Sequence, residues 1–591
     1  MKYTVLLLIA CLLFSCTSKA PKVYNDGFIT YAPVSLTDDE KAIIRKSVER
    51  QEDRYDPAGK MLVSELNGWN YHTDALTGKF HQVRGSFSYA VSLLDLDDPK
   101  YQQRAFDVIE KTISLQDTDP ASRSCGVWPY YEEEPLATKK SPIDFNWADF
   151  NAVSLLDIYM GHQDKIPADL LKKIEDALIL AAKSIQKRNV SPGYTNIAIM
   201  GTYVTYVVSH LFDMPELKEY AIARLQKFYD YTQEKNGFSE YNSPTYTITA
   251  LDELDRMKRH IIEPGARKTI DALYTIAWDI VAKHWHKPTA QWAGPHSRSY
   301  STPLRSSVYG ILYGASDGKI DYGYKDERSD VKIKHRIPES LLPYFLTPVY
   351  PRIQRDVFEN ADPQIIGICY LTNRYALSTV NRSSLWNQRR PFLAYWGTPE
   401  KPSYLQVRVL HELYDLSAAT WFGDQKDNTV LSAINFATNG GDKHISIDIL
   451  ENGKFVAQDF RLRFEFGNTD VNKLTLPTKN DAPVSFELDG LQFNLCLYHA
   501  VFGDLKGYWE KGSNETTAWL DFVLYTGVEK VIDLEAINHA ALGFSFSIAA
   551  PGDKTPKEAV KYAVKNGVLD AEWNGLKVSL PVKPDKKPRN I

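Results

Sequence analysis

The spacing of apolar residues changes once along this 591-residue chain, and this change constrains the fold more than any single motif does. Up to about residue 290, segments such as "PADLLKKIEDALILAAKSIQ" carry apolar residues at a helical period. Beyond residue 365, segments such as "FRLRFEFG" alternate apolar and polar residues, which predicts strands. The sequence therefore predicts an α+β multidomain protein, with helices first and strands second.

The helical part is predicted to form two layers. It begins with a capping box, Thr37 to Glu40, and continues through a series of amphipathic segments separated by Pro, Gly and Asp. "TNIAIMGTYVTYVVSHLF" is apolar on nearly every side, whereas "PELKEYAIARLQKFYDYTQ" is charged on one face. The first should lie inside a layer formed by helices of the second kind, which predicts an α/α toroid. An α-solenoid is the alternative, but it would require a repeat of constant period.

The part beyond residue 365 is predicted to be an antiparallel β-sandwich. Its expected strands, from "KHISIDIL" to "GLKVSLPVK", follow one another without helices, which excludes parallel βαβ units. The turns "ENGK" and "LDGL" are typical of two-residue hairpins. In the stretch before them, "IPESLLPYFLTP" predicts one more short helix. The expected domains are a leader over 1–16, a toroid over 17–364 and a sandwich over 365–591.

The first residues, "MKYTVLLLIACLLFSC", predict a secretory signal, because the apolar run is too short to span a bilayer. Its end resembles a bacterial lipobox, which implies that Cys16 is lipidated, although an ordinary cleavage site nearby is the alternative. We expect an envelope lipoprotein, anchored to a membrane and facing the periplasm or the outer surface. Cys125, Cys369 and Cys496 are isolated, so no disulfide framework, metal site or cofactor is predicted.

The composition favours a carbohydrate over a nucleic acid as the partner. Aromatic residues make up 12% of the chain, with 35 Tyr and 12 Trp, and these side chains stack on sugar rings while keeping one polar atom available. A large core with many half-buried tyrosines is the alternative interpretation. The formal net charge of −5 argues against nucleic acid, which requires a basic face. An anionic sugar would need locally placed basic residues.

The segment "YNSPTYT", residues 241–247, resembles a loop-to-helix motif of a known enzyme family. Ser243, Pro244 and Tyr246 match the Ser-Pro-x-Tyr portion found in the heparinase II/III and alginate lyase families of bacterial polysaccharide lyases. These families combine an α/α toroid with a β-sandwich. Their Glu, Gln and final His positions are occupied here by Tyr241, Asn242 and Thr247, so the resemblance implies no His-based role at this motif.

Asn196, in "GYTNIAIMG", matches a second hallmark of that family, an Asn at the start of an apolar inner helix. The resemblance implies β-elimination of a uronic-acid-containing polysaccharide or oligosaccharide. This reaction needs groups that offset the substrate carboxylate, for which Asn196 and Arg298 are suitable, and a base and an acid, for which Tyr246 is a candidate. "WAGPHSRSYS" adds His296 and Tyr300, and a cation there could help a Tyr to ionise.

Each candidate catalytic residue also has a purely structural interpretation. Tyr246 could pack at a helix start with its hydroxyl satisfied by the loop. Arg298 could form a surface ion pair in a solvated loop. Asn196 could cap its helix.

Two earlier segments, "NGWNYHTDALTGKFHQVRG" and "WPYYEEEPLATKKSPIDFNWADFN", gather aromatic and polar residues at predicted loops of the toroid. The residues expected to bind substrate are Trp69, His72, His81, Arg84, Trp128, Asn146, Trp147 and Asp149, together with Asn242 of the "YNSPTYT" segment.

A glycoside hydrolase of the glucuronidase type is the main alternative function. Hydrolysis needs a pair of carboxyl groups, and Asp144, Asp149 and Glu240 lie in helix breaks beside aromatic residues. A lyase is favoured because Tyr241 replaces the family's Glu in the matching segment. A non-catalytic glycan-binding lipoprotein is a third possibility, but it leaves the clusters of Tyr, His, Arg and Asn unexplained.

Overall fold

The structure is a computed structural model that describes residues 22–23, 28–68, 70, 72–442 and 450–586. The expected leader with Cys16, the aromatic residue Trp69 and nearly all of the expected strand "KHISIDIL" lie outside the described residues. Residues 38–346 contain the α-helices α1 (Asp38–Glu49), α2 (Val83–Leu96), α3 (Pro99–Ile113), α4 (Asn146–His162), α5 (Ala168–Arg188), α6 (Thr195–Leu211), α7 (Pro215–Glu234), α8 (Tyr246–His260), α9 (Pro264–His284), α10 (Ser306–Ala315) and α11 (Leu342–Leu346).

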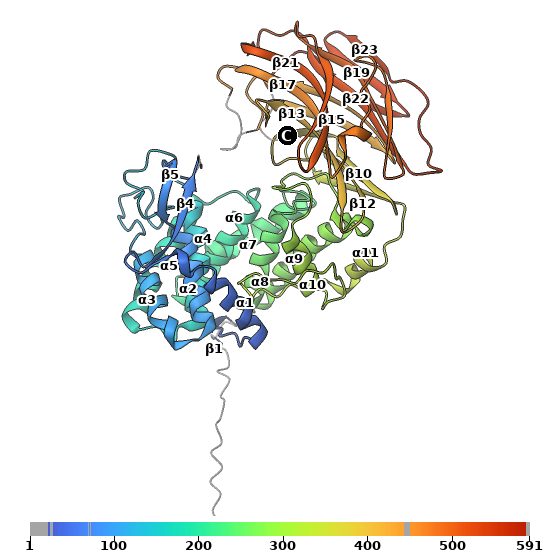
Figure 1. Cartoon of the computed structure of the whole chain (residues 1–591). Coiled ribbons are helices and arrows are strands. Elements are labelled where there is room, and N and C mark those ends of the chain that lie inside the picture. The colour runs from blue at the N-terminus through green and yellow to red at the C-terminus, as the bar shows by residue number, and fades with distance from the viewer. Residues whose placement is uncertain (1–21, 24–27, 69, 71, 443–449, 587–591) are drawn as a thin grey trace, which may run out of the picture.

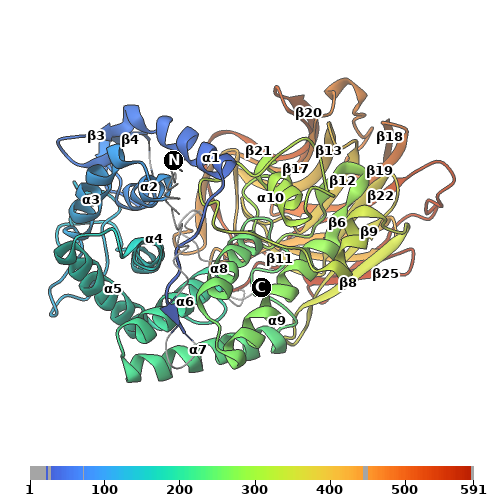
Figure 2. The ribbon, with the colours of Figure 1, turned by 90° about the horizontal axis from the view of Figure 1, so that it is seen from below.

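The helices form the two-layered, incomplete toroid that the sequence predicts (Figures 1 and 2). Helices α2, α4, α6 and α8 pack side by side as an inner layer, and α3, α5, α7 and α9 pack as an outer layer. In α6, residues 195–210 are all buried, whereas α7 buries a single stripe. This matches the contrast between the two sequence segments, because a helix that is apolar all round needs neighbours on every side.

A segment of the chain over residues 326–337 packs inside the toroid and is held there by buried charges. Lys332 reaches Asp95 of α2, with Nζ to Oδ2 at 2.9 Å. Arg259 of α8 donates to Asp157 of α4 at 2.8 Å and to the Lys332 carbonyl at 3.3 Å. Lys332 and Asp95 are each less than a tenth exposed. The segment therefore ties inner helices together through paired charges.

We predict that Lys332→Met will lower the free energy of unfolding by about 3–5 kcal/mol, because removing one partner leaves buried carboxylates uncompensated. Chemical denaturation monitored by circular dichroism measures this. The control is Arg336→Met, which removes an exposed ion pair with Asp317 and should cost less than about 1 kcal/mol. Equal effects of the two variants would contradict the structural role given to Lys332.

The strands form a sandwich with an additional small sheet. The strands of the C-terminal part are β8 (Arg352–Glu359), β9 (Ile365–Leu371), β10 (Tyr375–Val380), β11 (Arg382–Ser384), β12 (Phe392–Gly397), β13 (Pro402–His411), β14 (Tyr414–Asp415), β15 (Ala419–Lys426), β16 (Thr429–Phe436), β17 (Lys454–Gly467), β18 (Val484–Leu488), β19 (Leu491–Phe502), β20 (Tyr508–Ser513), β21 (Thr517–Asp533), β22 (Ala540–Ala549), β23 (Lys561–Lys565), β24 (Val568–Trp573) and β25 (Leu576–Pro581). Among the described strands, a nine-stranded and a six-stranded antiparallel sheet enclose one apolar core. The sheet β23–β24–β25 packs on the six-stranded sheet through a second core.

Three features refine the sequence-based expectations. The β-domain begins at β8, before the expected boundary at residue 365, because β8 pairs with β9. The "LDGL" turn joins β18 to β19, with positive φ at Asp489 and Gly490, as a two-residue hairpin requires. The helical part also contains short strands that were not expected: β1 (Lys22–Val23), β2 (Ile29–Tyr31), β3 (Tyr55–Asp56), β4 (Met61–Asn67), β5 (Thr77–His81), β6 (Trp285–His286) and β7 (Gln291–Trp292).

The loop after β7 joins the toroid to the sandwich. His296 and Arg390 exchange two backbone hydrogen bonds of 3.1 and 2.9 Å. Ser299 donates its backbone N–H to the Gln388 carbonyl at 2.7 Å. Within the described ranges, no helix combines the length and the apolar character needed to cross a bilayer.

Candidate functional site

The inner helices begin at one rim of the toroid. Each inner helix is followed by an antiparallel outer helix, so the inner helices run parallel and their N-terminal ends lie together. Asn146 is the first residue of α4, Asn196 the second of α6 and Tyr246 the first of α8. The positive ends of the helix dipoles therefore lie on the same side as these polar side chains.

The loop before α8 explains why Tyr246 occupies a helix start. The Ser243 hydroxyl accepts a hydrogen bond from the Tyr246 backbone N–H at 3.0 Å and donates to the Arg298 carbonyl at 2.7 Å. Asn242 adopts a left-handed conformation with φ of 43°, and its amide bonds the Ala293 and Pro295 carbonyls. Because Asn242 is fully buried, the expectation that it binds substrate is wrong.

Arg298 connects Tyr246 to a loop carboxyl group and to the sandwich. Its Nη2 donates to the Tyr246 hydroxyl at 3.0 Å, its Nη1 to Glu240 at 3.2 Å and its Nε to Gln388 at 2.7 Å. The guanidinium also lies over the Trp386 ring, 5.2 Å from its centroid. Arg298 is thus not a solvated surface ion pair, since its position is fixed by three hydrogen bonds.

Tyr246 and Tyr300 form a hydrogen-bonded pair of phenols. Their hydroxyl oxygens are 2.8 Å apart, and Tyr300 is 45% exposed, so the pair is accessible from solvent. Burial raises the pKa of Tyr246 above its usual value, and the nearby Arg298 cation only partly offsets this effect. Tyr246 is therefore protonated at neutral pH, and its anion becomes available as the pH rises.

Glu240 and Asn196 lie beside this pair. Burial raises the pKa of Glu240 to about 7, while Arg298 and the backbone N–H of Asn196 act in the opposite direction. Glu240 Oε2 and Asn196 Oδ1 are buried and have no hydrogen-bond partner among the described residues. Tyr194, not Asn196, occupies the N-cap position of α6, so the capping interpretation of Asn196 is wrong.

His296 is not part of this group. It is 2% exposed, its Nδ1 lies 2.7 Å from the Asn242 carbonyl, and burial lowers its pKa to about 3. The expectation that His296 supplies a cation is therefore wrong, because its imidazole is neutral. The polar residues of this loop predicted that it would be exposed, but backbone pairing with Arg390 places His296 in the domain interface.

A second group of residues continues along the same rim. His72 stacks on Tyr130 with ring centroids 4.8 Å apart, and Trp147 packs against both rings. Asn146 donates to the Tyr194 hydroxyl at 3.0 Å and accepts a hydrogen bond from Arg188 at 2.6 Å. Tyr194 is 39% exposed. Aromatic faces and polar groups of this kind suit a sugar ring.

Sequence reasoning did not select three of the residues in these two groups: Tyr194, Trp386 and Gln388. Tyr194 could have been found, since it directly precedes the apolar helix that holds Asn196. Trp386 and Gln388 could not, because their contacts to Arg298 cross a domain boundary that local patterns do not report.

Other predicted substrate residues lie elsewhere. Trp128 is fully buried and donates to the Thr112 carbonyl at 3.0 Å, so it belongs to the helical core. His81 sits between Glu133 and Asp56, at 2.6 and 3.0 Å. Neither placement supports the expected role in substrate binding.

Arg84, the second residue of α2, is the basic residue of the aromatic group. It is exposed, and its guanidinium lies 4.0 Å from the centroid of the Phe150 ring. Among the described residues, its guanidinium forms no ion pair within 4 Å. The expectation that Arg84 binds substrate stays a prediction.

Asp149 is a buried carboxyl group behind the rim. It is 1% exposed, its Oδ1 faces Gly201, and burial raises its pKa to about 7. Asp144 is more accessible and lies 3.4 Å from His72 Nδ1. A direct role for Asp149 in binding or hydrolysis is disfavoured, because a substrate atom cannot reach it without a rearrangement of α4 and α6.

We predict that the free energy of unfolding falls between pH 5 and pH 8 by about 2–4 kcal/mol less in Asp149→Asn than in the wild type. The folded-state pKa lies above the unfolded value, so the stability that protonated Asp149 contributes is lost as the pH rises toward and through 7. Denaturant unfolding at several pH values measures this, with the exposed Asp169→Asn as the control. An identical pH dependence in both variants would contradict it.

Comparisons with known proteins give one family-profile match and several similar solved structures. The profile of a domain of unknown function, DUF8769, matches residues 41–319, and no curated protein matches the chain. The chain is similar to a crystal structure of heparinase III at 10% identity, with a TM-score of 0.44 and coverage of 93% of this chain and 92% of that one. It is also similar to the chondroitin AC lyase of Streptomyces coelicolor A3 (9%, TM-score 0.46, coverage 91% and 84%) and to the heparan sulfate lyase HepC of Pedobacter heparinus (9%, TM-score 0.37, coverage 93% and 90%).

The described residues contain no group of three or more His, Cys, Asp or Glu side chains placed to hold a metal ion. Cys125, Cys369 and Cys496 are free thiols.

Proposed function

We propose that this protein cleaves a uronic-acid-containing polysaccharide or oligosaccharide by β-elimination at Tyr246. The observation that carries the proposal is the contact set of the Tyr246 hydroxyl, which lies 2.8 Å from the Tyr300 hydroxyl and 3.0 Å from Arg298. A phenol between a cation and a second, exposed phenol can accept or donate a proton at the protein surface.

A substrate carboxylate would bind at the first turn of α6. There it would meet the positive end of the helix dipole and, when Glu240 is protonated, an O–H donor, with the largely buried side-chain amide of Asn196 beside it. These donors would offset the carboxylate charge and make the adjacent C5 proton more acidic. Groups held in place before the reaction stabilise the charge that develops in the transition state.

The tyrosine pair would then transfer the protons. When the pair has lost one proton, it consists of one phenolate and one phenol. The phenolate takes the C5 proton, the C5–H electrons form the C4–C5 double bond, and the C4–O bond breaks. The leaving oxygen takes a proton from the pair, which returns it to its starting charge. Arg298 stabilises the phenolate, because its Nη2 already contacts the Tyr246 oxygen.

The aromatic group at the rim would bind a neighbouring sugar residue. Tyr130 and His72 are partly exposed and offer ring surface, while the buried Trp147 packs against both. The exposed Tyr194 offers a hydroxyl that accepts a hydrogen bond from Asn146. Hydrolysis is supported less well, since it needs two carboxyl groups flanking the glycosidic bond, and Asp149 is buried while Glu240 is tied to Arg298.

We predict that Tyr246→Phe will lower kcat by a factor of about 10² to 10⁴, because the variant retains the ring but lacks the proton-transferring oxygen. Absorbance of the unsaturated product on a panel of uronic acid glycans measures this. Tyr220→Phe, which removes a hydroxyl on α7 that bonds Asn189 and Arg224 and not the tyrosine pair, should change kcat less than twofold.

Thermal melts should show that Tyr246→Phe remains folded. Near-normal turnover in this variant would reject Tyr246 as the catalytic residue. Cleavage without absorbance of an unsaturated product, together with strong loss in Asp144→Asn or Glu240→Gln, would instead establish hydrolysis.

We predict that kcat/KM will rise about tenfold per pH unit below pH 7 and then level off. The phenolate becomes more abundant as the pH rises toward the elevated pKa of Tyr246, while protonated Glu240 is lost above its pKa of about 7, and the two trends cancel. In Glu240→Gln, which cannot ionise, kcat/KM should continue to rise above pH 7. Profiles of the same shape for both proteins would contradict a donor role for Glu240.

A further inference from the structure

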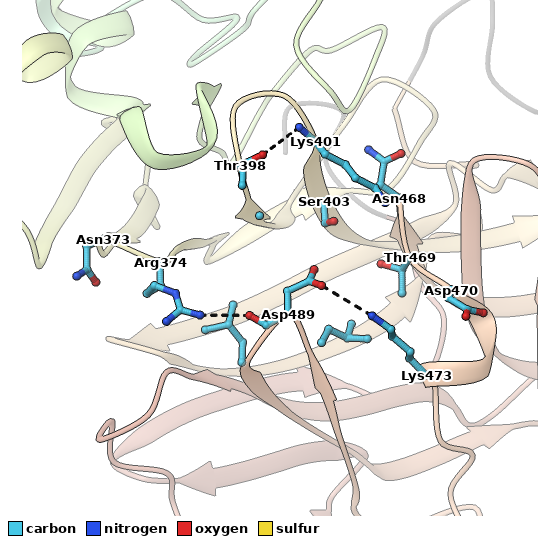
Figure 3. Close-up of a pocket in the computed structure, with 13 residues that line it drawn as sticks. Asn373, Arg374, Thr398, Lys401, Ser403, Asn468, Thr469, Asp470, Lys473 and Asp489 are labelled. Carbon is cyan, nitrogen blue, oxygen red and sulfur yellow. Dashed lines mark hydrogen bonds and ion pairs between the residues drawn. The ribbon is translucent and has the colours of Figure 1, made fainter.

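A polar cavity of about 540 Å³ lies in the sandwich, formed by four turns (Figure 3). The turns follow β9, β12 and β17 and join β18 to β19. Strand β12 runs from the domain interface to the cavity. Arg390, which pairs with His296 at the interface, precedes this strand, and Gly397 at its other end lines the cavity. Since β12 has six residues, the cavity lies about 20 Å from the domain interface along this strand.

The carboxyl groups of this cavity are already engaged by the protein. Asp489 Oδ2 accepts a hydrogen bond from Trp396 Nε1 at 3.0 Å, and its Oδ1 faces Lys473 at 3.9 Å. Asp470 accepts hydrogen bonds from the backbone and side chain of Asn472, at 2.9 and 3.0 Å. Their acceptor capacity is directed at neighbouring residues of the same turns.

The cations of the cavity retain most of their hydrogen-bonding capacity. Arg374 donates to the Asp489 carbonyl at 3.2 Å, which uses one of the five N–H donors of a guanidinium. The Lys401 ammonium contacts no acceptor in the described part of the chain, and Lys473 has only the distant Asp489. Figure 3 shows the three cationic side chains around one cavity, whose other polar lining includes Asn373, Thr398, Ser403, Asn468 and Thr469.

We propose that this cavity binds an acidic saccharide unit, carboxylated or sulfated, of the same glycan that is cleaved at Tyr246. Unsatisfied cationic donors beside amide and hydroxyl groups match an anionic sugar. The lining contains no aromatic ring, only Leu488 and Leu491 as apolar residues, so recognition rests on charge and hydrogen bonds and not on stacking. The identity of the polymer rests on the proposed function; the anionic character of the ligand does not.

Such a site would hold the polymer at a second point. A glycan bound in the cavity would present its other residues to the tyrosine pair at a raised effective concentration. Long chains would benefit from this effect and short ones would not. Binding would also weaken with salt, because the three cations are exposed to solvent.

The test uses the full-length Tyr246→Phe protein, which is expected to cleave the ligand at least about a hundredfold more slowly, with and without Arg374→Gln, Lys401→Gln and Lys473→Gln combined. Calorimetric titration is performed at low salt with a chondroitin sulfate tetrasaccharide, tetragalacturonate, cellotetraose and inorganic sulfate. We expect two binding sites for at least one acidic tetrasaccharide and the loss of one site, or at least tenfold weaker binding there, in the triple variant.

The matched control replaces Lys506, Lys561 and Lys565 by Gln, which removes the same charge from exposed positions of the same domain and should change affinity less than twofold. Thermal melts verify folding of both triple variants. The proposal is overturned by unchanged binding in the cavity variant, by equal loss in the control, by equal binding of cellotetraose, or by inorganic sulfate binding as tightly as the saccharide.

The outcome is separable from that of the proposed function. Elimination by the wild-type protein with no effect of the cavity variant would overturn the cavity site alone. Acidic saccharide binding that depends on the cavity, in a protein that cleaves none of these glycans, would support the cavity site and reject the proposed function.

Discussion

The antiparallel pairing of each inner helix with an outer helix is the constraint on which the candidate site depends. It forces α2, α4, α6 and α8 to run parallel, so their first turns meet at one rim. Asn146, Asn196 and Tyr246 are about fifty residues apart along the chain, yet each lies within the first two residues of its helix. A single packing rule thus brings polar side chains and positive dipole ends together, while the apolar bodies of the helices supply the core.

Arg298 extends this arrangement to the second domain. Its three nitrogens contact the loop carboxyl of Glu240, the phenol of Tyr246 and the amide of Gln388, which lies in the sandwich. The sandwich therefore does more than support the toroid, because Gln388 and Trp386 orient a guanidinium at the center of the proposed chemistry. Movement between the domains would disturb this contact, since the hydrogen bonds of Arg298 require a fixed geometry.

The periodicity of the sequence was sufficient to predict the two domains, the buried position of α6 and the helix start at Tyr246, because these depend on local patterns. It was insufficient wherever tertiary pairing overrides local polarity. His296 lies in a segment of polar residues, but its pairing with Arg390 buries it. Asn242 was expected to contact substrate, but its side-chain amide donates hydrogen bonds to carbonyl groups of the neighbouring loop. Gln388 carries no local signal at all, since its role arises from a contact with Arg298 in the other domain.

Charged side chains with a structural role differ from those with a candidate binding role in whether the protein itself supplies their partners. Inside the toroid, Lys332 and Arg259 meet carboxylates or carbonyls at 2.8 to 3.3 Å, as buried charges must in order to offset their desolvation. In the sandwich cavity, by contrast, Arg374 and Lys401 keep donors that no described residue accepts. A chain with a net charge of −5 can therefore still attract an anionic polymer, because the affinity depends on where unpaired cations gather and not on the overall charge.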